Sequence, residues 1–189
     1  STPIVLAPMA LASGGALASA CARAGALGLV GGGYGDLAWT QREYTLALQA
    51  SHTNRIGCGF ITWKLDEDAS ALDWVLDHAP EHRPRAVMLS FGAARRYAAR
   101  IAASGAALIC QIQRMEQAPQ ALEAGATAIV AQGAEAGGHG MNALNGRATM
   151  TFVPELADWL AAHSPDTLLL AAGGIADGRT LAAAMVLGA

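Results

Sequence analysis

Short apolar runs recur along the chain, and stretches with helical spacing lie between them. The runs are almost continuously apolar and do not alternate with polar residues, as expected for strands that are covered on both faces. Helices on either side of a parallel sheet provide that cover. The runs that predict strands are 3–9, 26–32, 55–60, 85–91, 106–113, 127–133 and 167–174.

The segments between these runs predict helices. Leu17, Ala20, Cys21 and Ala24 recur at the spacing of one helix face, ahead of Gly25. The chain therefore alternates strand and helix from its first residues.

Two further helices are predicted from a capping residue and from an apolar face. Asp36 is placed to cap a helix that begins at Leu37. Leu72, Val75 and Leu76 share one face of a later helix. The repeated βα pattern predicts an α/β fold, either an open doubly wound sheet or a closed (β/α)8 barrel.

The number of similar units favours the barrel. No reversal of the pattern marks the switch point of an open sheet, and we expect one domain over residues 1–189. The chain stops at "MVLGA", where the seventh helix would lead to another strand. We therefore expect a (β/α)8 barrel cut before its eighth strand. Such a piece would leave two strand edges unpaired and prone to aggregation, so we expect that it is not the whole working molecule.

Composition and charge narrow the function classes. With 53% hydrophobic and 14% charged residues, the 189-residue chain can bury a full core. A net charge of −3 without a Lys/Arg run predicts no nucleic-acid or membrane partner. No apolar stretch reaches 18 residues, "STPIVLAPMA" lacks the basic start of a signal peptide, and the three cysteines are widely spaced. We expect a soluble cytoplasmic protein without disulfides or metal.

Polar residues and glycines follow the apolar runs, and in a barrel the chemistry gathers at the carboxyl ends of the strands. The segments in question are 7–10, 31–36, 61–64, Gln111 with Gln113, 132–140 and 171–175. Glycines there allow close approach of a ligand and present N–H groups to anionic oxygens. "AGGIADG", which leads into a helix, is placed for a cofactor phosphate.

The segment "QGAEAGGHG", residues 132–140, has the strongest chemical character. It opens a stretch without clear period that reaches about Met150, ahead of a helix around 155–162, and loops of that length are usually functional. His139 is its candidate catalyst. Glu135 is either a partner of His139 or a solvated charge. No G-x-S-x-G motif and no H-E-x-x-H motif occurs, so we expect neither a hydrolase nor a zinc enzyme.

These residues resemble a known family. "PIVLAPMA", "VMLSFG", "ICQIQ", "AIVAQGAEAGGHG" and "LLLAAGGIADGRTLAAAMVLGA" are similar, in order and spacing, to the nitronate monooxygenases, formerly called 2-nitropropane dioxygenases. The resemblance extends over essentially the whole chain. It implies a (β/α)8 barrel that holds FMN non-covalently at the carboxyl-terminal mouth.

The resemblance also implies roles for individual residues. Ala7, Pro8 and Met9 would lie beside the isoalloxazine ring, Gln111 and Gln132 near its polar edge or the ribityl chain, Gly137 and Gly138 against it, and Gly173 and Gly174 on the phosphate, while His139 faces the substrate. In family terms, an alkyl nitronate reduces FMN and O2 reoxidises it, giving a carbonyl compound and nitrite. The small-molecule substrate and O2 are the only partners implied, and the oligomeric state is left open.

The sequence departs from the family pattern at one position, and two functions other than nitronate oxidation remain open. Many relatives carry Asn where this chain has Gly59, which puts that flavin contact in doubt and leaves Thr62 as a weak substitute. An NAD(P)H-dependent flavin reductase acting on a quinone or an enoyl thioester would share the FMN residues. A non-catalytic remnant would bind no FMN at all.

Overall fold

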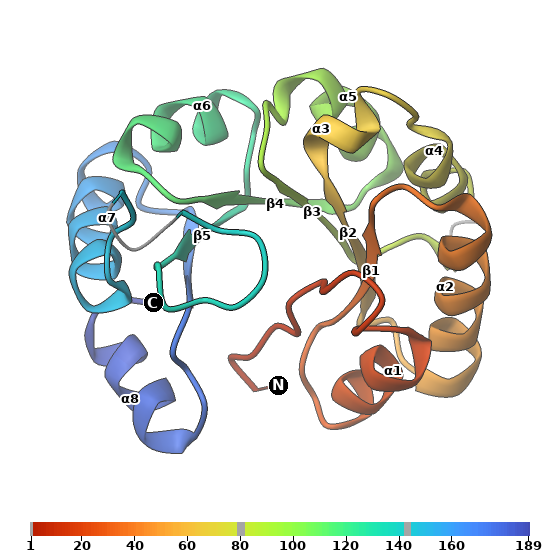
Figure 1. The fold of residues 1–189 in the computed structure, drawn as a ribbon, viewed down its shortest axis with the longest axis horizontal. Helices are drawn as coiled ribbons and strands as arrows, with labels where there is room; N and C mark the ends of the chain where they lie inside the picture. The colour runs from red at the N-terminus through yellow and green to blue at the C-terminus, as the bar shows by residue number, and fades with distance from the viewer. Residues whose placement is uncertain (1, 79–81, 142–144) are drawn as a thin grey trace. The chain divides into compact units, whose positions relative to one another are not determined.

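A computed structural model describes residues 2–78, 82–141 and 145–189 of the chain (Figure 1). It divides the chain into two compact units, Ser1–Leu108 and Ile109–Ala189. Each unit consists of parallel strands with helices between them, and the units are described in turn.

The first unit contains three consecutive parallel strands, β1 (Gly28–Gly33), β2 (Ile56–Ile61) and β3 (Ala86–Ser90), paired in chain order. Every residue of these strands is buried. This burial explains why the runs are continuously apolar instead of alternating. The start of β4 (Ala107–Ile112) also belongs to this unit.

In the described part of the first unit, five α-helices accompany the strands. They are α1 (Gly15–Arg23), α2 (Leu37–Ser51), α3 (Thr62–Leu65), α4 (Ser70–Leu76) and α5 (Arg95–Ser104). Helices α1 and α2 lie side by side along β1 (Figure 1). Their backbones approach so closely that a Cβ added at Gly15 would lie 2.3 Å from the carbonyl oxygen of Glu43.

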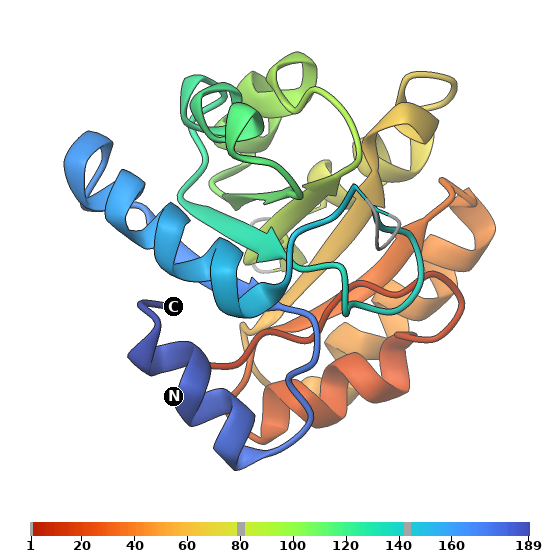
Figure 2. The same cartoon turned by 60° about the vertical axis from the view of Figure 1, so that its left-hand side comes forward.

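The second unit holds most of β4, then β5 (Ala128–Gln132) and β6 (Leu168–Ala172), again parallel and in chain order. Its helices are η2 (Met115–Gln117), α6 (Ala118–Glu123), α7 (Thr149–His163) and α8 (Gly178–Val186). Helix α7 packs on β5 and β6 (Figure 2).

Six of the predicted strands are confirmed, each within a few residues of its apolar run. The run 3–9 is the exception, because it forms only a single parallel bridge, Val5 with Leu27. Pro3 and Pro8 bracket this bridge, and a proline has no N–H to extend a ladder.

Two of the helix predictions are confirmed in detail. The Asp36 carboxylate accepts a hydrogen bond from Trp39 N at 2.8 Å, so it caps α2 as predicted. Leu72, Val75 and Leu76 are buried together on α4.

The predicted apolar face of α1 is wrong, although the helix itself is confirmed. Its buried residues are Gly15, Ala18, Ser19 and Ala22, and Leu17 is 41% exposed. The reason is close packing, since a Cβ at Gly28 would lie 2.1 Å from the carbonyl oxygen of Ala18. Small residues, and not the most apolar ones, fit such a contact.

Helix α7 begins earlier than the predicted range of 155–162. It starts at Thr149 and contains Pro154. Within the described ranges, no helix has both the length and the apolar character needed to cross a membrane.

Candidate functional site

The residues predicted for the site belong to two sets. Ala7, Pro8 and Met9 lie in the first unit, and the others lie in the second. Each set is built on the carboxyl ends of the strands of its own unit, where the predicted chemistry belongs.

The segment 7–9 is held by Ser13. The Met9 N–H donates to Ser13 Oγ at 2.7 Å, and Ser13 Oγ donates to the Met9 carbonyl at 3.1 Å. Gly31 N in β1 donates in turn to the Ser13 carbonyl at 2.8 Å. The backbone of Met9 is therefore fixed against β1, and 42% of the residue remains exposed.

Pro8 lies over β2. A Cβ added at Gly59 would lie 2.2 Å from Pro8 Cγ, so only glycine fits at this position. Thr62, the alternative contact, is buried, and its hydroxyl has no hydrogen-bond partner among the described residues. The departure at Gly59 thus has a structural cause, which is the room that Pro8 needs.

Three glutamines meet at the carboxyl ends of β4 and β5. Gln132 Oε1 accepts from Gln111 Nε2 and from Gln113 Nε2, each at 2.7 Å. Gln132 Nε2 donates to the His139 carbonyl at 3.0 Å. Gln132 is 8% exposed, and its amide therefore ties the loop of His139 to two strands.

The loop after β5 carries the predicted catalyst (teal in Figures 1 and 2). Gly137, Gly138 and His139 are all exposed. No described atom lies within 4 Å of a Cβ added at Gly137 or Gly138, but Gly138 has a φ of +76°. Backbone conformation therefore favours glycine at 138, and local packing does not require it at 137.

Glu135 is bound to the start of α7. Its Oε2 accepts from Thr149 N at 2.9 Å and lies 3.0 Å from Thr149 Oγ1. Burial alone would raise the pKa of Glu135, but the bonds from the backbone and side chain of Thr149 and from its own backbone hold it below the usual value. Neither sequence-based interpretation, a partner of His139 or a solvated charge, includes this contact.

The turn after β6 is a candidate anion cradle. Gly173 and Gly174 have φ values of +113° and +73°. No described residue accepts a hydrogen bond from the N–H of Gly173, Gly174 or Ile175. Successive free N–H groups with left-handed backbone form concavities that bind anions, so this turn fits a phosphate group.

The next helix does not add to this cradle. The Asp177 carboxylate accepts from Arg179 N at 2.9 Å and from Thr180 N at 3.2 Å. These first N–H groups of α8 are therefore already occupied. Only the N–H groups of the glycine turn are left to bind an anion at this place in the described chain.

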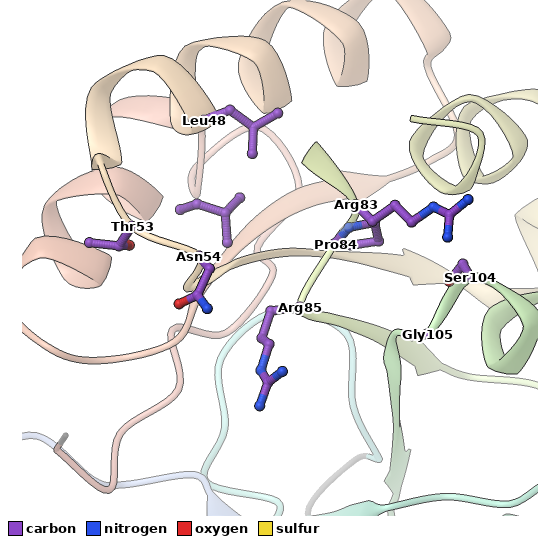
Figure 3. Close-up of a pocket in the computed structure, with 9 residues that line it drawn as sticks. Leu48, Thr53, Asn54, Arg83, Pro84, Arg85, Ser104 and Gly105 are labelled. Atoms are coloured by element: carbon purple, nitrogen blue, oxygen red, sulfur yellow. The ribbon is translucent and has the colours of Figure 1, made fainter. Parts of the chain in front are cut away.

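A surface cavity lies away from these strand ends. A surface cavity of about 400 Å3 is found in the first unit at the amino ends of β2 and β3, and Figure 3 shows the side chains around it. Its lining residues are Leu48, Thr53, Asn54, Ile56, Arg83, Pro84, Arg85, Ser104 and Gly105. None of the predicted site residues lines it. Polar groups converge instead at the strand ends, where the three glutamines meet.

The site includes residues to which the sequence assigned no role. Ser13 and Thr149 each hold a predicted residue or its loop in place. Gln113 was placed with Gln111 at the end of its strand but received no role, and in the structure it donates to Gln132. Ser13 and Thr149 carried no signal in the sequence. No three His, Cys, Asp or Glu side chains in the described part of the chain gather to hold a metal ion.

Comparisons with known proteins point to one family. A family model described as nitronate monooxygenase matches residues 65–189. A nitronate monooxygenase of Neurospora crassa is 33% identical over 98% of this chain and 57% of the relative. The chain therefore spans a little more than half the length of this curated relative.

Two solved structures are similar over nearly the whole chain. FabK from Thermotoga maritima matches with a TM-score of 0.82 and 28% identity, over 99% of this chain and 55% of the other. A nitroalkane oxidase from Streptomyces ansochromogenes matches with a TM-score of 0.81 and 26% identity, over 99% and 63%. The α/β class and the (β/α)8-barrel type predicted from the sequence are confirmed by this likeness.

Proposed function

The chain belongs to the nitronate monooxygenase family, and from that premise we propose that the protein is an FMN-dependent enzyme that oxidises alkyl nitronates. The oxidant is O2, and the products are a carbonyl compound and nitrite. The family is one of flavin oxidoreductases. The proposal of FMN for this chain is supported chiefly by the turn after β6.

The three free N–H groups at Gly173, Gly174 and Ile175 would hold the phosphate of FMN. A bound FMN supplies the electron acceptor that the side chains of this protein lack. Ala7, Pro8 and Met9 would lie beside the isoalloxazine ring, as would Gly137 and Gly138, while Gln111 and Gln132 would contact its polar edge or ribityl chain. The fixed backbone of Met9 and the joined glutamine amides support these roles.

His139 would face the substrate. A nitronate is an anion already rich in electrons, so the protein mainly has to position it and to offer a donor for its oxygens. An imidazole can provide this donor, and it can also remove the α-proton of a neutral nitroalkane. The bond from Gln132 Nε2 to the His139 carbonyl holds the loop in which this imidazole lies.

A cytoplasmic location is part of the proposal. Cys21, Cys58 and Cys110 are all free thiols in the structure, which fits a reducing compartment. Partners other than the small-molecule substrate and O2 are not needed for this chemistry.

The proposed function is tested by the visible absorption spectrum of the purified protein, before and after anaerobic addition of a nitronate. We expect a flavin band that the nitronate bleaches and that NAD(P)H leaves unchanged. Bleaching by NAD(P)H would instead indicate a flavin reductase. A colourless protein that cannot be reconstituted with FMN would contradict both enzyme functions and favour a non-catalytic remnant.

A further inference from the structure

Three segments of the second unit are joined at one side chain, Thr149. The hydroxyl of Thr149 lies 3.0 Å from Glu135 Oε2, in the loop after β5, and 3.0 Å from the Gly173 carbonyl oxygen, in the turn after β6. Thr149 itself is the first residue of α7. One hydroxyl therefore links the loop, the helix and the turn that would hold the phosphate.

The hydroxyl is enclosed by backbone on two sides. A Cβ added at Gly133 would lie 2.1 Å from Thr149 Oγ1, and a Cβ added at Gly173 would lie 2.8 Å from the same atom. Thr149 is only 8% exposed. Its hydroxyl thus occupies a fixed position, and the two glycines are needed to make room for it.

The hydroxyl has a single proton for three acceptors, because the Ala172 carbonyl oxygen also lies 3.5 Å from it. An ionised carboxylate and a backbone carbonyl can only accept, so Thr149 Oγ1 donates mainly to one of the two nearer acceptors, Glu135 or Gly173, at any one time. Glu135 is also held by Thr149 N at 2.9 Å. The carboxylate therefore fixes the start of α7 and competes with the Gly173 carbonyl for the hydroxyl proton.

The Gly173 carbonyl is one half of a peptide unit whose other half is the Gly174 N–H. The unit is planar and trans, so its C=O and N–H point in opposite directions. When the carbonyl is bound to Thr149, the Gly174 N–H points away from Thr149. Both residues are glycines with positive φ, which can rotate more freely than other residues, so the unit needs such a constraint.

We infer that Thr149 and Glu135 are positioning residues that orient the Gly173–Gly174 peptide for the phosphate monoester of the cofactor. The inference rests on the proposed function, because it assigns that phosphate to the glycine turn. Neither residue is expected to touch the reacting atoms. Their effect should be confined to the binding of a ligand that carries the phosphate.

The decisive comparison is between FMN and riboflavin, which has the same ring system without the phosphate. Thr149→Val keeps the shape of the side chain and removes the hydroxyl. We expect it to raise the Kd of FMN about tenfold, the loss of a hydrogen bond that supports a charged group, with little change in the Kd of riboflavin. Thr149→Ser keeps the hydroxyl and is the matched control, with both Kd values close to the wild type.

Glu135 is tested by a conservative rescue. The amide oxygen of Gln can take the place of Oε2 and accept from Thr149 N and Thr149 Oγ1 as the carboxylate does. Glu135→Gln should therefore bind FMN about as well as the wild type, while Glu135→Ala should bind it more weakly. Equal weakening by Gln and Ala would overturn the role of Glu135.

The outcomes separate the inference from the proposed function. Unchanged FMN binding in Thr149→Val, or equal weakening of FMN and riboflavin, overturns the inference alone. If the wild-type protein binds no flavin, the proposed function fails and the inference fails with it. Should Thr149→Val not fold, wild-type FMN affinity in Glu135→Ala would still overturn the inference.

Discussion

At the scale of single residues, Pro8 and Gly59 form a steric pair. Pro8 Cγ occupies the place of a side chain at 59, at 2.2 Å from a Cβ added there. The proline and the glycine therefore depend on each other. A side chain at 59 would displace the segment 7–9 that we propose beside the flavin.

We predict that Gly59→Ala destabilises the protein, by about 1–3 kcal/mol, the usual range for overpacking a buried position. The measurement is urea unfolding followed by circular dichroism. Gly137→Ala is the matched control, because nothing lies within 4 Å of a Cβ there and no positive φ is recorded for Gly137. Equal stability of the two variants would show that Pro8 does not hold its position over β2.

We predict that His139→Ala retains FMN and loses turnover of a neutral nitroalkane by about 10²–10⁴-fold, the usual contribution of a general base. The nitronate anion needs no deprotonation and should suffer less. Steady-state kinetics with both substrates checks this. His163→Ala is the control, since His163 stacks on Trp159 at the end of α7. Loss of flavin, or unchanged turnover, would contradict the role of His139.

The predicted site residues were accessible to sequence reasoning because they follow apolar runs in a recognisable motif. The residues that support them were not. Gln113 was noted at its strand end, but its contact with Gln132, 19 positions away, depends on strand register. The contact of Thr149 with Glu135, 14 positions away, depends on where α7 starts. Glu135 is exposed, in agreement with its interpretation as a solvated charge, but its contact with Thr149 was not predicted because this partner lies beyond the local sequence.

At the scale of elements, apolarity predicted the strands well and helix faces less well. Strands β1 to β3 are buried throughout, so hydrophobicity alone marks them. The buried face of α1 depends instead on how closely α1 approaches β1 and α2, and small residues at Gly15 and Ala18 permit this approach. Hydrophobic periodicity does not contain that information.

Helix α2 offers a test at this scale. Asp36 caps it by accepting from Trp39 N, and Asp36→Ala should lower the free energy of unfolding by about 1 kcal/mol, the typical value of a helix cap. Asp36→Asn keeps an acceptor oxygen and should lose much less. Denaturant unfolding of the three proteins decides the matter, and indistinguishable alanine and asparagine variants would show that the cap contributes nothing.

At the scale of the whole molecule, one device recurs at helix starts in both units. Asp68 accepts from Ser70 N at the start of α4, Glu135 from Thr149 N at the start of α7, and Asp177 from Thr180 N near the start of α8. A carboxylate at the amino end of a helix meets both free N–H groups and the positive end of the helix dipole. These acidic residues thus stabilise the helices that follow the strand ends.

Because of these bonds, the protein should lose stability in acid. The hydrogen bond from the Ser70 backbone N–H holds the pKa of Asp68 below its ordinary 3.8. The bonds from the Arg179 side chain and from Thr180 N hold the pKa of Asp177 below the same value. The bonds from Thr149 hold the pKa of Glu135 below its ordinary 4.5. The unfolded chain therefore binds more protons than the folded protein in this range, and stability rises with pH.

We accordingly predict that the free energy of unfolding begins to fall as the pH drops below about 5, where these carboxylates start to be protonated in the unfolded chain. The loss continues until the pH reaches the lower pKa values of the folded protein. The measurement is urea unfolding at a series of pH values. A triple variant, Asp68→Asn with Glu135→Gln and Asp177→Asn, keeps acceptor oxygens but cannot titrate, so its stability should depend less on pH. An equally steep loss in the triple variant would place the acid sensitivity in other groups, whereas a flatter one would assign it to the carboxylates that begin these helices.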